Sequence, residues 1–129
     1  MENVSVKSIQ TNKRRVFIYW LEFLKPYHKL ANKEMEALGT LLYYRFELAK
    51  EISNTELVDR LLFSSDMRKK VRSDLGDMKS GVFNNLLTAL RIKKVITKDN
   101  KIHPSLIPNM DPDSNGFKLI FNFEINETK

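Results

Sequence analysis

Cysteine is absent from this chain of 129 residues, which excludes disulfides, thiolate metal sites and cysteine nucleophiles. The two histidines, His28 and His103, are too few for a histidine metal site. Four glycines and four prolines exclude collagen-like and low-complexity sequence. The most apolar stretch, Val16 to Leu24, is far shorter than a bilayer span and contains Glu22, and the N-terminus does not resemble a signal peptide. We therefore expect a soluble cytoplasmic protein.

Positive charge is in excess and is confined to one part of the chain. Lysine and arginine number 22 against 16 acidic residues, which gives a net charge of +6. Between Asp66 and Lys101 lie ten basic and four acidic residues, so this interval accounts for the whole excess. A cationic surface binds polyanions by displacing their condensed counterions. The alternative is a solvated basic face on an ordinary domain.

Apolar periodicity predicts a mainly helical chain behind a flexible N-terminal tail of residues 1–12. Pro26 is expected to end the first helix, Asn32 to cap the second, and Ser53 to open the third in a capping box with Glu56. Gly76 stops the fourth helix. The expected helices cover residues 13–24, 33–50, 53–62, 66–75 and 80–91.

The 80–91 segment separates into two faces at 100° per residue. Its apolar side holds Val82, Phe83, Leu86, Leu87, Ala89 and Leu90. Its polar side holds Ser80, Gly81, Asn84, Asn85, Thr88 and Arg91. A face that only needs to be soluble is usually filled with Lys and Glu, whereas this one carries short neutral hydrogen-bonding groups. Asn pairs with adenine edges and Arg with guanine or phosphate.

Beyond residue 91 the pattern changes to strands. A hairpin is predicted over residues 95–103, with its turn at 98–101, and a further strand over 117–125, where apolar residues alternate. The predicted fold class is therefore mainly α with a small antiparallel β-sheet (α+β). No linker divides residues 13–129, which we expect to form one domain.

The order helix, turn, amphipathic helix, hairpin resembles the winged helix-turn-helix family of bacterial and phage regulators and replication initiators. The resemblance covers residues 54–103, behind an N-terminal helical layer over 13–52. It is carried by the spacing Val71-x3-Leu75-Gly76, then Ser80-x-Val82-x-Asn84-x-Leu86-x3-Leu90-Arg91-x4-Ile96. It implies that the second helix enters the major groove of double-stranded DNA and the hairpin touches the backbone. The turn departs from the pattern by carrying Asp77 and Met78.

Two sets of residues are the predicted DNA contacts. Base-edge contacts are assigned to Ser80, Asn84, Asn85, Thr88 and Arg91. Backbone contacts are assigned to Arg68, Lys69, Arg72, Lys79, Lys93, Lys94, Lys98 and Lys101. Each set has an alternative. Neutral residues such as Ser80 and Asn85 could cap or contact a neighbouring element. The cations Arg68, Lys69 and Arg72 could pair with Asp66 or Asp74, and Lys98 and Lys101 could only keep a hairpin soluble.

No local motif favours an enzyme. The run from Asp111 to Gly116 matches the start of a calcium loop, but Asn122 stands where the bidentate Glu belongs, so a polar turn is the preferred interpretation. Gly-rich phosphate loops and nucleophile elbows are absent from the sequence. We expect no enzymatic activity, metal, cofactor or small-molecule substrate.

The first helix is apolar nearly all round, more than a small domain usually covers. We therefore expect a homodimer formed through the N-terminal helices. The predicted function is DNA binding in transcription or replication. The alternative is a structural or adaptor protein, for example of a phage particle, that uses a winged-helix fold for protein contacts. A single-strand or RNA binder is a third, remote option because no aromatic platform is evident on the expected strands.

Overall fold

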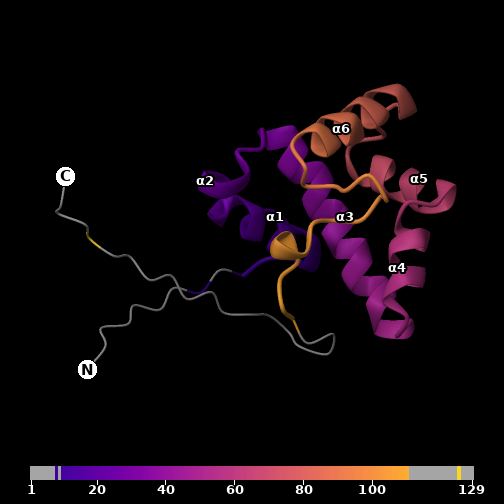
Figure 1. The fold of residues 1–129 in the computed structure, drawn as a ribbon, viewed down its shortest axis with the longest axis horizontal. Helices are drawn as coiled ribbons and strands as arrows, with labels where there is room; N and C mark the ends of the chain where they lie inside the picture. The colour runs from indigo at the N-terminus through magenta and orange to yellow at the C-terminus, as the bar shows by residue number, and fades with distance from the viewer. Residues whose placement is uncertain (1–7, 9, 111–124, 126–129) are drawn as a thin grey trace.

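The computed structural model describes residues 8, 10–110 and 125. Six α-helices and one 3-10 turn make up the secondary structure of this part of the chain (Figure 1). In order they are α1 (Lys13–Phe23), α2 (Lys25–His28), α3 (Asn32–Glu51), α4 (Thr55–Leu62), α5 (Ser65–Asp74), α6 (Ser80–Ile92) and η1 (Pro104–Leu106).

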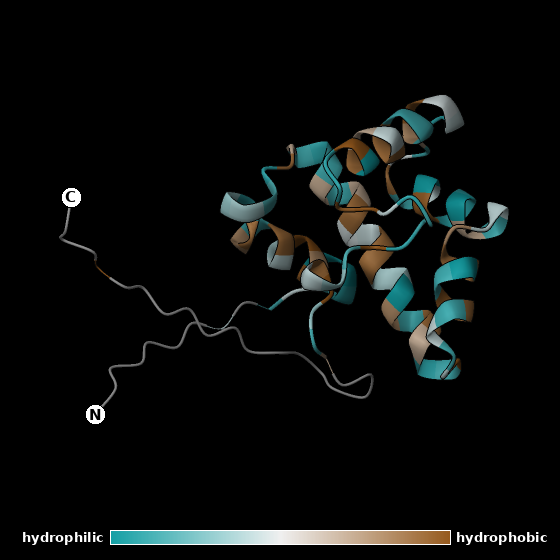
Figure 2. Ribbon diagram, in the orientation of Figure 1, coloured by the Kyte–Doolittle hydropathy of each residue, from teal (hydrophilic) through white to brown (hydrophobic). Residues whose placement is uncertain are grey.

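The long helix α3 runs through the middle of the molecule and contacts α1, α4, α5 and α6 (Figure 1). It is long enough to reach all of them because a 20-residue helix extends about 30 Å. Hydrophobic and hydrophilic residues alternate along it (Figure 2), and Leu38, Leu41 and Leu42 are buried. Burial of these side chains against the surrounding helices forms one continuous core.

Side-chain caps fix where several helices begin. Asn12 accepts from the backbone N–H of Arg15, and Ser64 does the same for Met67. The expectation for α4 was wrong by one residue, because the cap is Asn54 rather than Ser53. The Asn54 carboxamide oxygen accepts from the Leu57 N–H at 3.2 Å.

The start of α3 also differs from the prediction. Asn32 lies inside the helix and Ala31 is the cap residue. Ala31 has no side-chain oxygen to offer, so the interaction runs in the other direction: the Glu34 carboxylate accepts from the Ala31 N–H at 2.7 Å. A carboxylate in the first turn suits the positive end of a helix.

The predicted antiparallel sheet is not present in the part of the chain that the structure describes. Residues 95–103 form a tight loop with one isolated bridge, Ile96 to Ile102, rather than two strands. Val95 and Ile96 direct their N–H groups to the Leu90 carbonyl at 3.1 and 3.3 Å, so one arm is bonded to the end of α6. Pro104, which lacks an N–H, then starts η1. The described part of the chain is therefore mainly helical, and the expected strand at 117–125 lies outside the described residues, Ile125 excepted.

The first helix is covered more fully by its own chain than its sequence indicated. Phe17, Ile18 and Leu21 are buried, the first and last of them in the core. Trp20 is partly buried and donates from its indole N–H to the Leu106 carbonyl at 2.8 Å, which ties η1 to α1. The apolar stripe that suggested a dimer is therefore used largely within one molecule.

Candidate nucleic-acid interface

Helices α5 and α6 are joined by a sharp turn that sets their relative direction. Gly76 has φ +78° and Asp77 φ +57°, both in the left-handed region. The Met78 N–H donates to the Arg72 carbonyl at 3.0 Å, which closes the end of α5. Met78 is half-buried and packs against the core, while Asp77 is exposed. The apolar residue of this turn thus points inward and its acid faces solvent.

Helix α6 buries one side and exposes the other. Phe83, Leu87 and Leu90 are buried in the core. The side chains predicted to read bases lie on the opposite side, and four of them are exposed: Ser80, Asn84, Asn85 and Thr88. We call these four residues the polar face of α6. The structure therefore leaves this face accessible to a ligand instead of packing it beneath another element.

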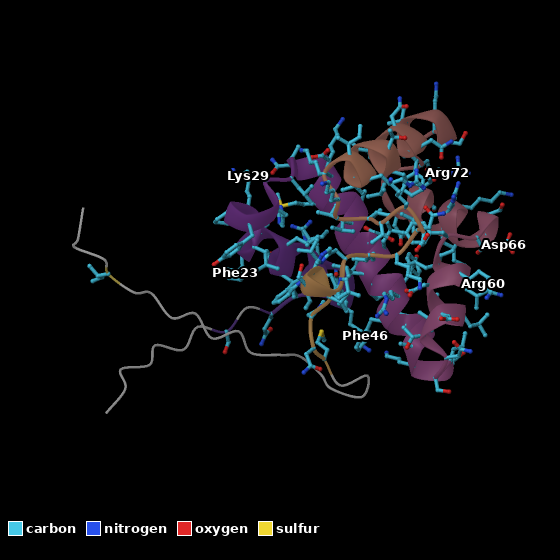
Figure 3. The ribbon with its side chains drawn as sticks, viewed as in Figure 1. Phe23, Lys29, Phe46, Arg60, Asp66 and Arg72 are labelled. Carbon is cyan, nitrogen blue, oxygen red and sulfur yellow. The ribbon has the colours of Figure 1, made fainter. Side chains whose placement is uncertain are left out.

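The N-terminal half of α6 and the outer side of α5 border an open hollow of about 240 Å³, which we call the α5–α6 hollow. Figure 3 places Arg72 between the two helices. Predicted contacts of both kinds meet here, since backbone contacts from α5 and base contacts from α6 line the same depression. The lining residues are Ser65, Arg68, Lys69, Arg72, Ser80, Phe83 and Asn84.

Three of the predicted cationic contacts are already engaged within the chain. Arg68 donates from Nε to the Phe63 carbonyl at 3.0 Å. Lys93 forms an ion pair with the buried Glu34 carboxylate at 2.7 Å, so it links α6 to α3 rather than standing free. Arg91, the third, is bonded to Asn100. Among the described residues, no hydrogen bond or ion pair holds the side chains of Lys69, Arg72, Lys79, Lys94, Lys98 and Lys101.

The acids near these cations form no ion pairs with them among the described residues. Asp74 accepts a hydrogen bond from the Tyr44 hydroxyl at 2.5 Å, and Asp66 forms no ion pair with a described residue. Burial and the neighbouring Asp74 carboxylate raise the pKa of Tyr44 well above its usual range, so the phenol remains a donor. The alternative in which Arg68, Lys69 or Arg72 pairs with Asp66 or Asp74 is therefore not what the structure contains.

Arg91 contacts the 95–103 loop. Its guanidinium donates twice to the Asn100 side-chain oxygen, from Nη2 at 2.7 Å and from Nε at 3.2 Å. Asn100 has φ +57°, in the left-handed region that Asn tolerates at a turn. Lys98 and Lys101 are exposed at the same turn. Arg91 therefore positions the loop, a role that nothing in the sequence around Arg91 or Asn100 indicates.

Val82 is the residue at this surface that the sequence placed wrongly. It was assigned to the apolar, inward side, yet it is 49% exposed beside Asn85. Its position at the margin of the apolar arc, next to Ala89 in projection, is the only sequence signal of this. Ile92, at the last residue of α6, is 75% exposed.

The structure offers little for other chemistries within the residues it describes. No three His, Asp or Glu side chains there are grouped so as to hold a metal ion. No helix in the same residues has the length and apolar content to cross a bilayer. The acidic turn at 111–116 lies outside them. A second hollow, about 390 Å³ between α4 and the 99–101 turn, has mixed charge from residues that include Asp59, Arg60 and Lys101.

Comparison with family models, with curated proteins and with solved structures finds no match to this chain. Its function is therefore inferred from its own residues.

Proposed function

We propose that this protein is a non-enzymatic, cytoplasmic protein that binds double-stranded DNA in transcription or replication, with α6 inserted in the major groove. The observation that carries the proposal is the α5–α6 hollow, where unpaired cations of α5 stand beside the exposed polar face of α6. Cations beside neutral hydrogen-bonding groups suit a ligand with charged backbones on either side of a groove lined by base edges.

The two kinds of side chain would act at different stages. Lys69, Arg72 and Lys79 are exposed or half-buried around the N-terminal half of α6 and carry no internal partner among the described residues. They attract phosphates and set the orientation of the protein on the duplex. The width of a B-DNA major groove, about 12 Å, admits a helix such as α6. Lys98 and Lys101 would contact the backbone from the 95–103 loop.

The test is the salt dependence of binding to a random duplex, measured by fluorescence anisotropy at several salt concentrations. The variant K69A/R72A removes two charges from the α5–α6 hollow. Each phosphate that is no longer neutralised lowers the slope of log K against log salt by about 0.9, so we expect a reduction of about 2. Over a fourfold rise in salt the affinity of the wild type should therefore fall roughly tenfold more than that of the variant.

A matched control removes two charges elsewhere. Lys25 and Lys33 are exposed on α2 and the start of α3, away from α5 (Figure 1). K25A/K33A has the same net charge as K69A/R72A and should keep the wild-type slope. Equal losses in the two variants would mean that only net charge matters, and absence of salt-dependent binding in the wild type would refute the proposal.

A second candidate is favoured by one observation, the apolar margin of α6. Val82 and Ile92 are exposed and Leu86 and Ala89 are half-exposed along this margin. Exposed apolar residues in a row on one helix suit a protein partner. In that case the chain is a structural or adaptor protein. The wild type would then bind no duplex, and V82K would lose binding to the protein partner.

A further inference from the structure

The exposed surface of α6 carries no charge through its first three turns. From Ser80 to Leu90 the sequence contains no Lys, Arg, Asp or Glu. The exposed residues of that stretch are Ser80, Gly81, Val82, Asn84, Asn85 and Thr88. Its chemistry is therefore limited to hydroxyls, carboxamides and methyl groups.

Arg91, the one cation of the helix, has its guanidinium edge occupied. Nε and Nη2 both donate to the Asn100 oxygen, at 3.2 and 2.7 Å. These two nitrogens form one of the edges with which an arginine reads the N7 and O6 acceptors of guanine. Arg91 would have to release the 95–103 loop to use that edge, so only the Nη1–Nη2 edge of the guanine-reading group assigned from the sequence is left open.

The groups that remain match one base pair better than the other. An Asn carboxamide offers one donor and one acceptor side by side, the complement of adenine N7 and N6–H₂. Methyl groups pack against the C5-methyl of thymine. Guanine is usually read by the paired donors of Arg or Lys and cytosine by the acceptor of Asp or Glu, and the exposed stretch from Ser80 to Thr88 provides none of these four residue types.

Thr88 adds to this set through its methyl group. Its hydroxyl donates to the Asn84 carbonyl at 3.0 Å, so the hydroxyl hydrogen is used within the helix. What Thr88 offers outward is a methyl group and an oxygen that accepts. Val82, 49% exposed, offers two methyl groups.

Helix geometry brings the two kinds of group together. Val82 and Asn85 are three residues apart, and Asn84 and Thr88 are four apart, so the members of each pair are neighbours on the surface of α6. Each pair combines one carboxamide with one methyl-bearing side chain. We propose, on the basis of the DNA-binding function above, that α6 selects A·T base pairs, with Asn84 and Asn85 pairing with adenine edges and Val82 and Thr88 contacting thymine methyls.

The experiment measures binding of the full chain to three duplexes of equal length at one salt concentration. The first contains an A·T-rich centre, the second is the same duplex with uracil replacing thymine, and the third has a G·C-rich centre. The uracil duplex keeps the A·T hydrogen-bonding edges and lacks only the methyl groups. We expect the A·T duplex to bind at least about fivefold more tightly than the G·C duplex. Replacement by uracil should weaken binding about fourfold for each thymine methyl that α6 covers in the A·T duplex.

Two variants connect these effects to residues. V82A removes exposed methyl groups without touching the core, and should bind the thymine and uracil duplexes more equally than the wild type does. I92A is the matched control, because it truncates an exposed apolar residue at the C-terminal end of α6, and should keep the wild-type ratio. N84A/N85A should reduce the preference for A·T over G·C.

The outcomes separate the two proposals. Failure to bind any of the three duplexes overturns the DNA-binding function itself. Salt-dependent binding of all three with equal affinity, or tighter binding of the G·C duplex, leaves DNA binding in place and overturns A·T selection. A loss of the thymine preference in I92A and not in V82A overturns the assignment of the methyl contact to Val82.

Discussion

Glu34 is a buried acid that links the start of α3 to the end of α6. Its carboxylate accepts from Lys93 Nζ and from the Ala31 N–H, both at 2.7 Å. Burial alone would raise the pKa of Glu34, but the hydrogen bonds from Lys93 and Ala31 and the Lys93 charge lower it below its usual 4.5. The ionised form is thus the one that the folded chain prefers.

This preference predicts a pH dependence of stability. A carboxyl whose pKa is lower in the folded state stabilises the fold above its unfolded pKa, and that stabilisation is lost as pH falls through the folded pKa. We expect E34Q to reduce the free energy of unfolding by about 1 kcal/mol at pH 7 and by less below pH 4. The loss at pH 7 is modest because solvent partly screens the Lys93 charge. Urea denaturation at a series of pH values measures this.

The exposed Glu36 provides the comparison for Glu34. E36Q changes the same charge on the same helix without removing a buried partner, and should leave the pH profile of unfolding as in the wild type. If E34Q and E36Q lose stability to the same extent at every pH, the ion pair with Lys93 contributes nothing specific.

Among the elements, α1 and α3 approach each other at Gly39. A Cβ added there would lie 2.7 Å from Ile18 Cγ1 and 3.2 Å from the Ile18 Cα and backbone N. Because part of the obstruction is backbone, α1 would have to shift. We expect G39A to destabilise the protein by about 1–3 kcal/mol and to lower Tm by roughly 5 °C or more.

Gly81 is the control glycine for this prediction. Nothing lies within 4 Å of a Cβ added at Gly81, which is also helical. G81A should therefore raise stability, by about 0.5–1 kcal/mol, through helix propensity alone. Thermal unfolding followed by circular dichroism compares the two, and a G39A protein as stable as the wild type would show that α1 is free to move away from α3.

The beginning of α4 depends on Asn54. N54A removes the side-chain acceptor for the Leu57 N–H and should cost about 1 kcal/mol in the free energy of unfolding. S53A, one residue earlier, is expected to change stability by less than about 0.5 kcal/mol. Denaturant titration of both variants decides between the two caps. The reverse order of effects would restore the capping box predicted from the sequence.

At the scale of the whole molecule, the exposed apolar residues of α1 and α2 lie away from the cations of α5. Phe23 and Arg72 lie at opposite ends of the molecule as viewed in Figure 3. Phe23 and Tyr27 are the large apolar side chains exposed on α1 and α2, Tyr27 at 82%. A homodimer through the N-terminal helices stays a prediction, and such a dimer would leave the α5–α6 hollow of each copy accessible.

Sedimentation equilibrium tests this dimer. Y27K places a charge in the exposed apolar patch and should raise the dimer Kd at least about tenfold without lowering Tm, since Tyr27 contributes little to the core. I92K, an equivalent change on α6, should leave self-association unchanged. A wild-type protein that is monomeric over the whole concentration range contradicts the dimer.

The sequence by itself determined five of the six described helices and the two-sided character of α6. It missed α2, since Pro26 was expected to end the first helix and instead lies in the first turn of α2. Apolar spacing is a local property, so it placed α6 within one residue and identified Phe83, Leu87 and Leu90 as inward. Asn84 and Thr88 came from the same pattern and lie on the exposed side. These inferences held because an isolated helix already defines which residues share a face.

Only the tertiary structure decided which of those residues are available to a ligand. Lys93 meets a carboxylate 59 positions earlier in the chain, Arg91 is held by Asn100, and Val82 is left half exposed at the margin of the buried side of α6. The two arms of the 95–103 loop do exchange hydrogen bonds, from Thr97 N–H to the Lys101 carbonyl and from His103 N–H to the Val95 carbonyl, but pairing goes no further than the single Ile96–Ile102 bridge. Val95 and Ile96 bond instead to the end of α6, and the apolar side chains of the loop are buried in the helical core. Whether a short apolar segment extends into a strand depends on the packing around it, which periodicity does not encode.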